Sequence, residues 1–304
     1  MRDATTCTEA GPARVGSAQP WLVAALRRPR YEVLPLAGTA DRVVEHVPPT
    51  IPVTVTCSPR RGLEATLRLT ETLSGRGFSV TPHLAARQVV DEAQLTEILH
   101  RLDAAGVRDV FVVAGDDERP AGEFADSIDF LRSLDRLRRG GGAPVPHRLG
   151  VAGYPEAHPL VGNDELMEAM RAKQPHAAYL VSQLCFDASA ISSWLADVRY
   201  AGVRLPLHVG VAGAVDQRRL LRVVQRIGVG PSARFLRKHR YGLLRLLRPG
   251  GYRPDSLVRA MAAELSDPTR GVAGLHIYTL GDVAATERWR QRALDRLSDE
   301  DGHA

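Results

Sequence analysis

Eight short runs of apolar and β-branched residues recur along the chain, and stretches with helical spacing separate them. Several runs are apolar throughout, which is typical of parallel strands buried on both faces. Eight strand–helix units favour a closed βα barrel over an open doubly wound sheet. Strands are expected at residues 31–36, 51–56, 78–84, 108–115, 148–156, 178–186, 205–213 and 272–280. Helices are expected at residues 62–76, 92–105, 123–140, 163–173, 188–201, 216–227, 255–266 and 284–298.

The predicted α/β barrel takes up most of the chain, because the 304 residues suffice for one barrel of about 250. We predict a single catalytic barrel domain at residues 22–298, between flexible tails at residues 1–21 and 299–304. The first residues lack the basic start and apolar core of a secretion signal. No apolar run approaches the ~20 residues of a membrane span, so the sequence predicts a cytoplasmic protein without a membrane partner.

Arginine carries nearly all of the positive charge. Lysine occurs only at Lys173 and Lys238, which disfavours Schiff-base chemistry, and the net charge of +5 fits anionic small molecules. Aromatic residues make up only 5% of the chain, so nucleic acid is not an expected partner. The three widely spaced cysteines indicate neither a disulfide framework nor a zinc site. The sequence leaves the oligomeric state open.

Polar residues stand at the ends of most of the predicted strands. Active sites of βα barrels lie at the carboxyl ends of the strands, so these side chains should converge on one mouth. The candidates are Glu32, Thr56, His83, Asp116, Tyr154, Glu156, His158, Gln183 and Tyr278.

Glu32 lies inside the apolar run YEVLPL. Burial of a carboxylate is costly unless it is paired or protonated, and burial raises its pKa. Such a group suits general acid catalysis near neutral pH, so Glu32 is predicted to be catalytic. The alternative is a structural glutamate paired with an arginine inside the barrel.

Asp116 follows Gly115 at the end of the fourth predicted strand. It could bind the amide edge of a ring or balance a developing cation, and glycine allows the backbone to approach a ligand closely. The alternative is an N-cap for the next helix, a role that Asp117 could also take.

Two further segments carry polar groups that suit ligand binding. The loop YPEAHP offers Tyr154 as a hydrogen-bonding group, whereas a metal site built from His158, Glu156 and His83 lacks a clear further ligand, so no metal is predicted. The amide of Gln183 could bind a pterin or a nicotinamide carboxamide, or could hydrogen-bond within the barrel interior.

Residues 216–253 form the most basic part of the chain. In the turn GVGPS at 228–232, glycines are followed by Pro and Ser at a predicted helix start, where free backbone amides bind anions. Phosphate sites in this fold often follow the last two strands. An amphipathic helix with solvated arginines explains the segment equally well.

These motifs together resemble those of methylenetetrahydrofolate reductases. Glu32, TPHL, AGD, YPEAHP, SQLCFD and YTLG occur in the family's order over residues 30–283. The resemblance implies a barrel that reduces methylenetetrahydrofolate to methyltetrahydrofolate, with a flavin relaying hydride from a reduced nicotinamide. It implies Glu32 as the acid that opens the folate ring, Asp116 beside the pterin and Gln183 as a folate contact. Tyr278 and Arg219 are also expected to bind the substrate, with Arg219 standing where the family has a glutamine. The positions matching those that line the flavin are Thr56, His83, Tyr154 and His158.

The chain also departs from the family pattern around the flavin phosphates. Ala114 replaces an arginine, Ala172 replaces a lysine and Glu168 stands where asparagine is common, although Arg171 is kept. Fewer cations should weaken pyrophosphate binding, so FAD is not expected to bind well. We predict direct hydride transfer from NADH, with NADPH as the alternative donor, and phosphate contacts from Arg171, Arg234 and Arg237. An ordinary flavin-dependent reductase and a non-catalytic folate-binding protein are the two alternatives.

Overall fold

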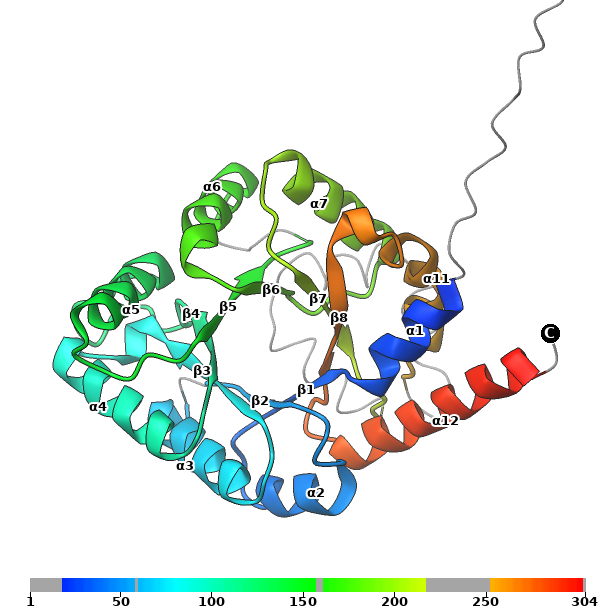
Figure 1. The fold of residues 1–304 in the computed structure, drawn as a ribbon, viewed down its shortest axis with the longest axis horizontal. Coiled ribbons are helices and arrows are strands. Elements are labelled where there is room, and N and C mark those ends of the chain that lie inside the picture. The colour runs from blue at the N-terminus through cyan, green and yellow to red at the C-terminus, as the bar shows by residue number, and fades with distance from the viewer. Residues whose placement is uncertain (1–17, 58–59, 157–160, 217–251, 303–304) are drawn as a thin grey trace, which may run out of the picture.

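The eight predicted strands form a closed parallel barrel in chain order (Figure 1). The computed structural model describes residues 18–57, 60–156, 161–216 and 252–302. The order confirms the barrel prediction. The strands are β1 Arg30–Val33, β2 Val53–Val55, β3 Val80–Ala85, β4 Asp109–Val113, β5 Arg148–Gly153, β6 Tyr179–Ser182, β7 Leu207–Ala212 and β8 Val272–Tyr278.

Helices surround the barrel on the outside (Figure 1). The α-helices are α1 Ala18–Arg27, α2 Thr39–His46, α3 Gly62–Gly75, α4 Glu92–Ala104, α5 Ser127–Gly140, α6 Asn163–Lys173, α7 Ala188–Tyr200, α11 Asp255–Leu265 and α12 Val283–Gly302. Short 3₁₀ turns are η1 Ala86–Gln88, η2 Gln174–His176 and η3 Pro268–Arg270. The helix expected at 216–227 lies outside the described residues except for Asp216.

The helices at the two ends of the chain extend beyond the expected domain limits. Helix α1 begins at Ala18, so residues 18–21 are helical and do not belong to a tail. It packs against α11 and α12 and buries Leu22 and Leu26. Helix α12 continues to Gly302, past the expected limit at residue 298. Helix α2, which was not expected, buries Val43.

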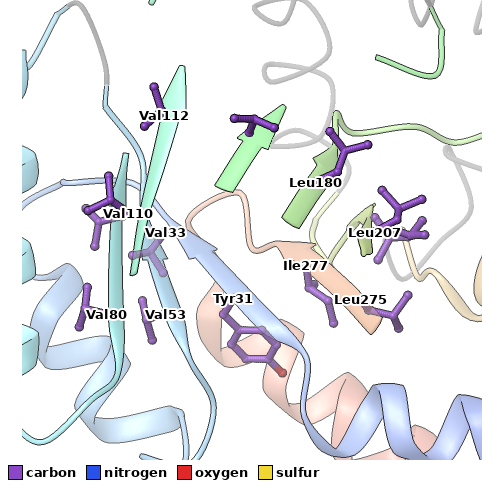
Figure 2. Close-up of a cluster of buried hydrophobic side chains, with 14 of the residues drawn as sticks. Tyr31, Val33, Val53, Val80, Val110, Val112, Leu180, Leu207, Leu275 and Ile277 are labelled. Atoms are coloured by element: carbon purple, nitrogen blue, oxygen red, sulfur yellow. The ribbon is translucent and has the colours of Figure 1, made fainter. Parts of the chain in front are cut away.

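Side chains along the strands alternate between an apolar outer face and an inner face that holds polar groups beside a smaller apolar cluster of Phe111, Tyr179 and Val181. Figure 2 shows part of the outer layer, in which Tyr31, Val53 and Val80 lie on neighbouring strands in matching register. The hydroxyl of Tyr31 donates to Glu287 of α12 at 2.7 Å, which fixes this face toward the helices. Two-residue alternation therefore directs Arg30 and Glu32 of β1 into the barrel.

A buried ion pair closes the barrel interior at the amino-terminal ends of the strands. Arg30 Nη2 lies 2.8 Å from Asp109 Oδ2, and it also donates to Thr81 and to the hydroxyl of Tyr179. Tyr179 donates to the other oxygen of Asp109 at 2.9 Å. A buried charge requires such partners. Because Arg30 is bound to Asp109, it does not neutralise Glu32.

Candidate active site

Glu32 lies inside the barrel between two histidines. One is on the adjacent strand β8, and the other is on β3, two strands away. Oε2 of Glu32 is 3.0 Å from Nε2 of His276 on β8 and 3.6 Å from Nε2 of His83 on β3. The side chain of Glu32 is 13% exposed, and those of His83 and His276 are 11% and 3% exposed. The arrangement leaves the carboxyl group nearly buried but still reachable.

Burial sets the protonation states of Glu32, His83 and His276. Desolvation raises the pKa of Glu32 to about 7, against a smaller opposing effect of His83. Desolvation lowers the pKa of His83 to about 4 and that of His276 to about 3, with Arg30 opposing the charged form of each. At neutral pH both imidazoles are neutral while Glu32 is partly protonated. A carboxyl group in this state can act as a general acid.

Tyr278 lies near Glu32 and contacts Ser182 and His276. Its hydroxyl donates to the backbone carbonyl of Ser182 at 3.0 Å, and its ring lies edge-on to His276 with 4.9 Å between ring centroids. Burial raises the pKa of Tyr278, and the charges of Glu32 and Tyr154 add to that effect. The structure thus brings Tyr278 and Glu32 together, as the sequence predicted for the ends of their strands.

Tyr154 and Asp116 extend the same group of side chains. Burial raises the pKa of Tyr154, and the nearby charge of Asp116 raises it further. Asp116 is exposed, and it follows Gly115, whose φ of +96° lies in the region that favours glycine. The mouth therefore carries a partly protonated acid in its floor and an exposed carboxylate at its rim.

The capping alternative for Asp116 is wrong. Helix α5 is capped by Asp126, which accepts from the backbone N–H groups of Ile128 and Asp129. Asp117 instead accepts from the amide of Gln88 at 2.8 Å. Asp116 is consequently available to a ligand.

Gln183 and Thr56 also reach the mouth from their strand ends. Gln183 is exposed, which excludes the alternative of an amide buried in the barrel interior, and its Oε1 accepts from the backbone N–H of Leu184 at 3.0 Å. Within the described part of the chain its Nε2 makes no hydrogen bond, so the donor is available. Thr56 Oγ1 is buried and has no hydrogen-bond partner among the described residues.

The structure does not bring Arg171 to the mouth. Arg171 lies in the last turn of α6, and its Nε donates to the carbonyl of Ala201, just after the end of α7. Helices of the barrel run opposite to the strands, so this turn lies at the amino-terminal ends of the strands. Its assignment to cofactor phosphates is wrong for that reason. The other cofactor and substrate candidates at His158, Arg219, Arg234 and Arg237 lie outside the described residues.

Sequence reasoning also missed His276. The residue lies two positions before Tyr278 on β8, so the two side chains share the inward face. That alternation was the available signal, whereas a histidine in the middle of an apolar strand is easily taken for core.

An apolar wall covers the β6–β8 side of the mouth. It is formed by buried residues Leu184, Ala212, Val215 and Tyr252, against which Phe186, Tyr278 and Leu280 pack. The rings of Phe186 and Tyr252 meet edge-on at 5.5 Å. Such a wall offers a dry contact for a planar ligand next to Glu32.

Other site types are absent from the described residues. No three potential metal-ligating side chains of His, Cys, Asp or Glu gather there. Among the same residues, none of the helices has the length and apolar character needed to span a bilayer.

A family profile described as methylenetetrahydrofolate reductase matches residues 28–230 of this chain. The chain belongs to the methylenetetrahydrofolate reductase family. It is also similar to methylenetetrahydrofolate reductase 2 of Saccharomyces cerevisiae, with 25% identity over 150 residues, 43% of this chain and 22% of the yeast protein. The chain thus spans under a quarter of the length of that relative.

One similar solved structure supports the fold alone. An oxaloacetate acetylhydrolase bound to 3,3-difluorooxalacetate is similar with a TM-score of 0.50 and 12% identity, over 93% of this chain and 86% of that one. A putative lyase/mutase from Burkholderia cenocepacia J2315 is similar with a TM-score of 0.45 and 15% identity, over 94% and 89% of the two chains.

The methylenetetrahydrofolate reductase family generally binds FAD, but the described residues do not fit its pyrophosphate. Arg171 lies at the opposite end of the barrel, and position 114 is alanine. Arg87, after β3, donates to the backbone carbonyls of Ala125 and Asp117. The first turn of α6 carries Asp164 and Glu165, which repel an anion. We therefore derive no step through a flavin.

Proposed function

We propose that this protein reduces methylenetetrahydrofolate to methyltetrahydrofolate with NADH as the direct hydride donor. The observation that carries the proposal is Glu32, a nearly buried carboxyl group with a pKa of about 7 at the mouth of a barrel of this family. An acid that still holds a proton near neutral pH is what opening of the folate ring requires.

Glu32 donates its proton to the folate nitrogen that leaves the methylene carbon, and that carbon–nitrogen bond breaks. The remaining nitrogen and the methylene carbon form a cationic iminium. Hydride from NADH adds to the iminium carbon, which gives the methyl group and NAD⁺, and Glu32 regains a proton from solvent. One proton and one hydride are consumed in each turnover.

Asp116 stabilises the iminium through its negative charge and holds the pterin through its oxygens. Its exposure and its proximity to Tyr154 support this role. Gln183 supplies an amide donor that orients the pterin or the nicotinamide, with Tyr278 beside it on the folate side. The apolar wall excludes water from the hydride path.

The dinucleotide also needs a site for its pyrophosphate. We assign it to the GVGPS turn with Arg234 and Arg237, on the sequence argument that backbone amides and guanidinium groups bind such anions. Replacing both arginines by alanine should raise KM for NADH and leave KM for folate nearly unchanged. Parallel assays with NADPH establish which donor is preferred.

The test is an assay of the purified protein with methylenetetrahydrofolate and NADH, preceded by an absorbance spectrum. We expect a colourless protein whose rate does not rise when free flavin is added. A yellow protein with a flavin that is reduced and reoxidised would favour the flavin-dependent alternative, which family membership supports. Folate binding without turnover under any reductant would favour the non-catalytic alternative.

A further inference from the structure

The two oxygens of Glu32 have different surroundings. His276 and His83 both face Oε2, at 3.0 and 3.6 Å, and only the first distance is within hydrogen-bonding range. Within the described residues no hydrogen bond reaches Oε1. One oxygen is therefore held by the protein while the other is left for the substrate.

The surroundings of His276 indicate which of its nitrogens carries the proton. The residue is 2% exposed, and its Nδ1 is buried without a hydrogen-bond partner among the described residues. Burial beside Arg30 keeps the imidazole neutral at physiological pH, so it has a single N–H. Orphaned buried N–H groups are rarer than unsatisfied acceptors, so the N–H belongs on Nε2, where it meets Glu32.

We propose that His276 is the positioning residue of the acid: its Nε2–H donates to Oε2 of Glu32 and thereby directs the catalytic proton to Oε1. This inference rests on the proposed function, because it assigns the oxygen that serves the folate ring. A carboxyl group that accepts at Oε2 carries its own proton on Oε1. His276 thus sets both the orientation of the carboxyl group and the site of its proton.

The charged and titratable groups around Glu32 make the effect of His276 on acidity clear. They are His83 from β3, His276 and Tyr278 from β8, and Arg30 from β1, whose charge is bound to Asp109. An N–H donor stabilises the ionised carboxylate. Loss of the His276 donor should raise the pKa of Glu32, and the fall of kcat toward alkaline pH should move to higher pH.

Nitrogen NMR of protein labelled with ¹⁵N-histidine tests the tautomer without any turnover. The signals of His276 are assigned by their loss in His276→Gln. We expect a protonated Nε2 and an unprotonated Nδ1 across neutral pH. An Nδ1–H tautomer would overturn the proposal, and it would do so whether or not the protein reduces folate.

Kinetics test whether the hydrogen bond matters for the acid. The amide of His276→Gln can replace the Nε2–H donor, whereas His276→Leu cannot. We expect kcat to fall about 100-fold in the leucine variant, as for a reacting group displaced by ~1 Å, with the alkaline limb shifted upward and KM for folate unchanged. The glutamine variant should recover most of kcat and the wild-type pH profile.

His208→Gln is the matched control. His208 is a further imidazole inside the barrel, with 5.5 Å between its ring centroid and that of Tyr179, and burial lowers its pKa to about 3. This variant should leave kcat and the pH profile unchanged. Equal losses in the glutamine and leucine variants at position 276, with an unmoved pH profile, would reduce His276 to a packing role. Absence of folate turnover in the wild type would instead remove the proposed function, while the nitrogen spectrum still decides the tautomer.

Discussion

The hydroxyl of Tyr278 donates a hydrogen bond to the carbonyl of Ser182, so its ring lies against Gly210 of the intervening strand β7. A Cβ at position 210 would lie 2.8 Å from Cε2 of Tyr278 and 2.1 Å from the oxygen of Ser182. Glycine is required there because both neighbours occupy the space that a side chain would take.

Gly210→Ala should therefore lower the free energy of unfolding by about 1–3 kcal/mol, as overpacking does, and reduce folate turnover by displacing Tyr278. Gly75→Ala is the control, because nothing lies within 4 Å of the added Cβ. Thermal or denaturant unfolding of both variants provides the measurement. Unchanged stability in Gly210→Ala would mean that the ring of Tyr278 moves aside at little cost and is not held in a fixed position.

The barrel itself could be predicted from the sequence, because strands buried on both faces produce apolar runs that stand out between helices. The first two helices, α1 and α2, were harder to predict from the sequence. The expected tail at residues 1–21 took in the start of α1, and α2 has only eight residues, so neither segment stood out as a long periodic run. Their stability comes from packing partners that the sequence does not reveal.

The site was predictable where it depends on strand ends. Glu32, Asp116, Tyr154 and Tyr278 were expected at the mouth and lie near one another there. His276 was not, since it lies deeper in its strand. Arg171 was misplaced because it was assigned from the resemblance alone, whereas the last turn of the expected helix at 163–173 lies at the amino-terminal ends of the strands.

Glu32→Gln should reduce folate turnover by about 10²–10⁴-fold, the usual loss when a general acid is removed, and leave folate binding intact. In the wild type, turnover should decline as pH rises above about 7, because the carboxyl group then loses its proton. Turnover rates and folate dissociation constants measured across pH check both statements. Near-wild-type turnover in the variant would remove Glu32 from the mechanism.

The same residue makes stability depend on pH. The pKa of Glu32 is raised from 4.5 to about 7, so the folded state holds a proton that the unfolded state has lost between these values. Wild-type stability is reduced as pH rises through this window, and Glu32→Gln escapes the loss. The free energy of unfolding of Glu32→Gln, relative to that of the wild type, should rise by on the order of 3 kcal/mol between pH 4.5 and 7. It should not rise further above pH 7.

Glu64→Gln is the control for this stability difference. Exposed hydrogen bonds from Arg101 and Arg68 lower the pKa of Glu64 to about 2, so its contribution is lost only as pH falls below 4.5. The difference in free energy of unfolding between Glu64→Gln and the wild type should stay constant between pH 5 and 8. A flat difference for Glu32→Gln as well would show that the folded carboxyl group is not protonated near neutrality.

Asp116→Asn should lower turnover far more than stability. The substitution keeps the shape but removes the charge that balances the iminium, and Asp126 rather than Asp116 caps α5. Steady-state kinetics and an unfolding curve separate the two effects. An unfolding midpoint that drops while turnover per folded molecule is kept would assign Asp116 a structural role.

Hydride transfer from NADH to folate, without a flavin between them, is the central claim. A single turnover with NADH deuterated at the transferable position, in flavin-free protein, tests it most directly. Our account predicts one deuterium in the methyl group of methyltetrahydrofolate and no exchange of the label with water. A methyl group without deuterium, or turnover that requires added flavin, would contradict it.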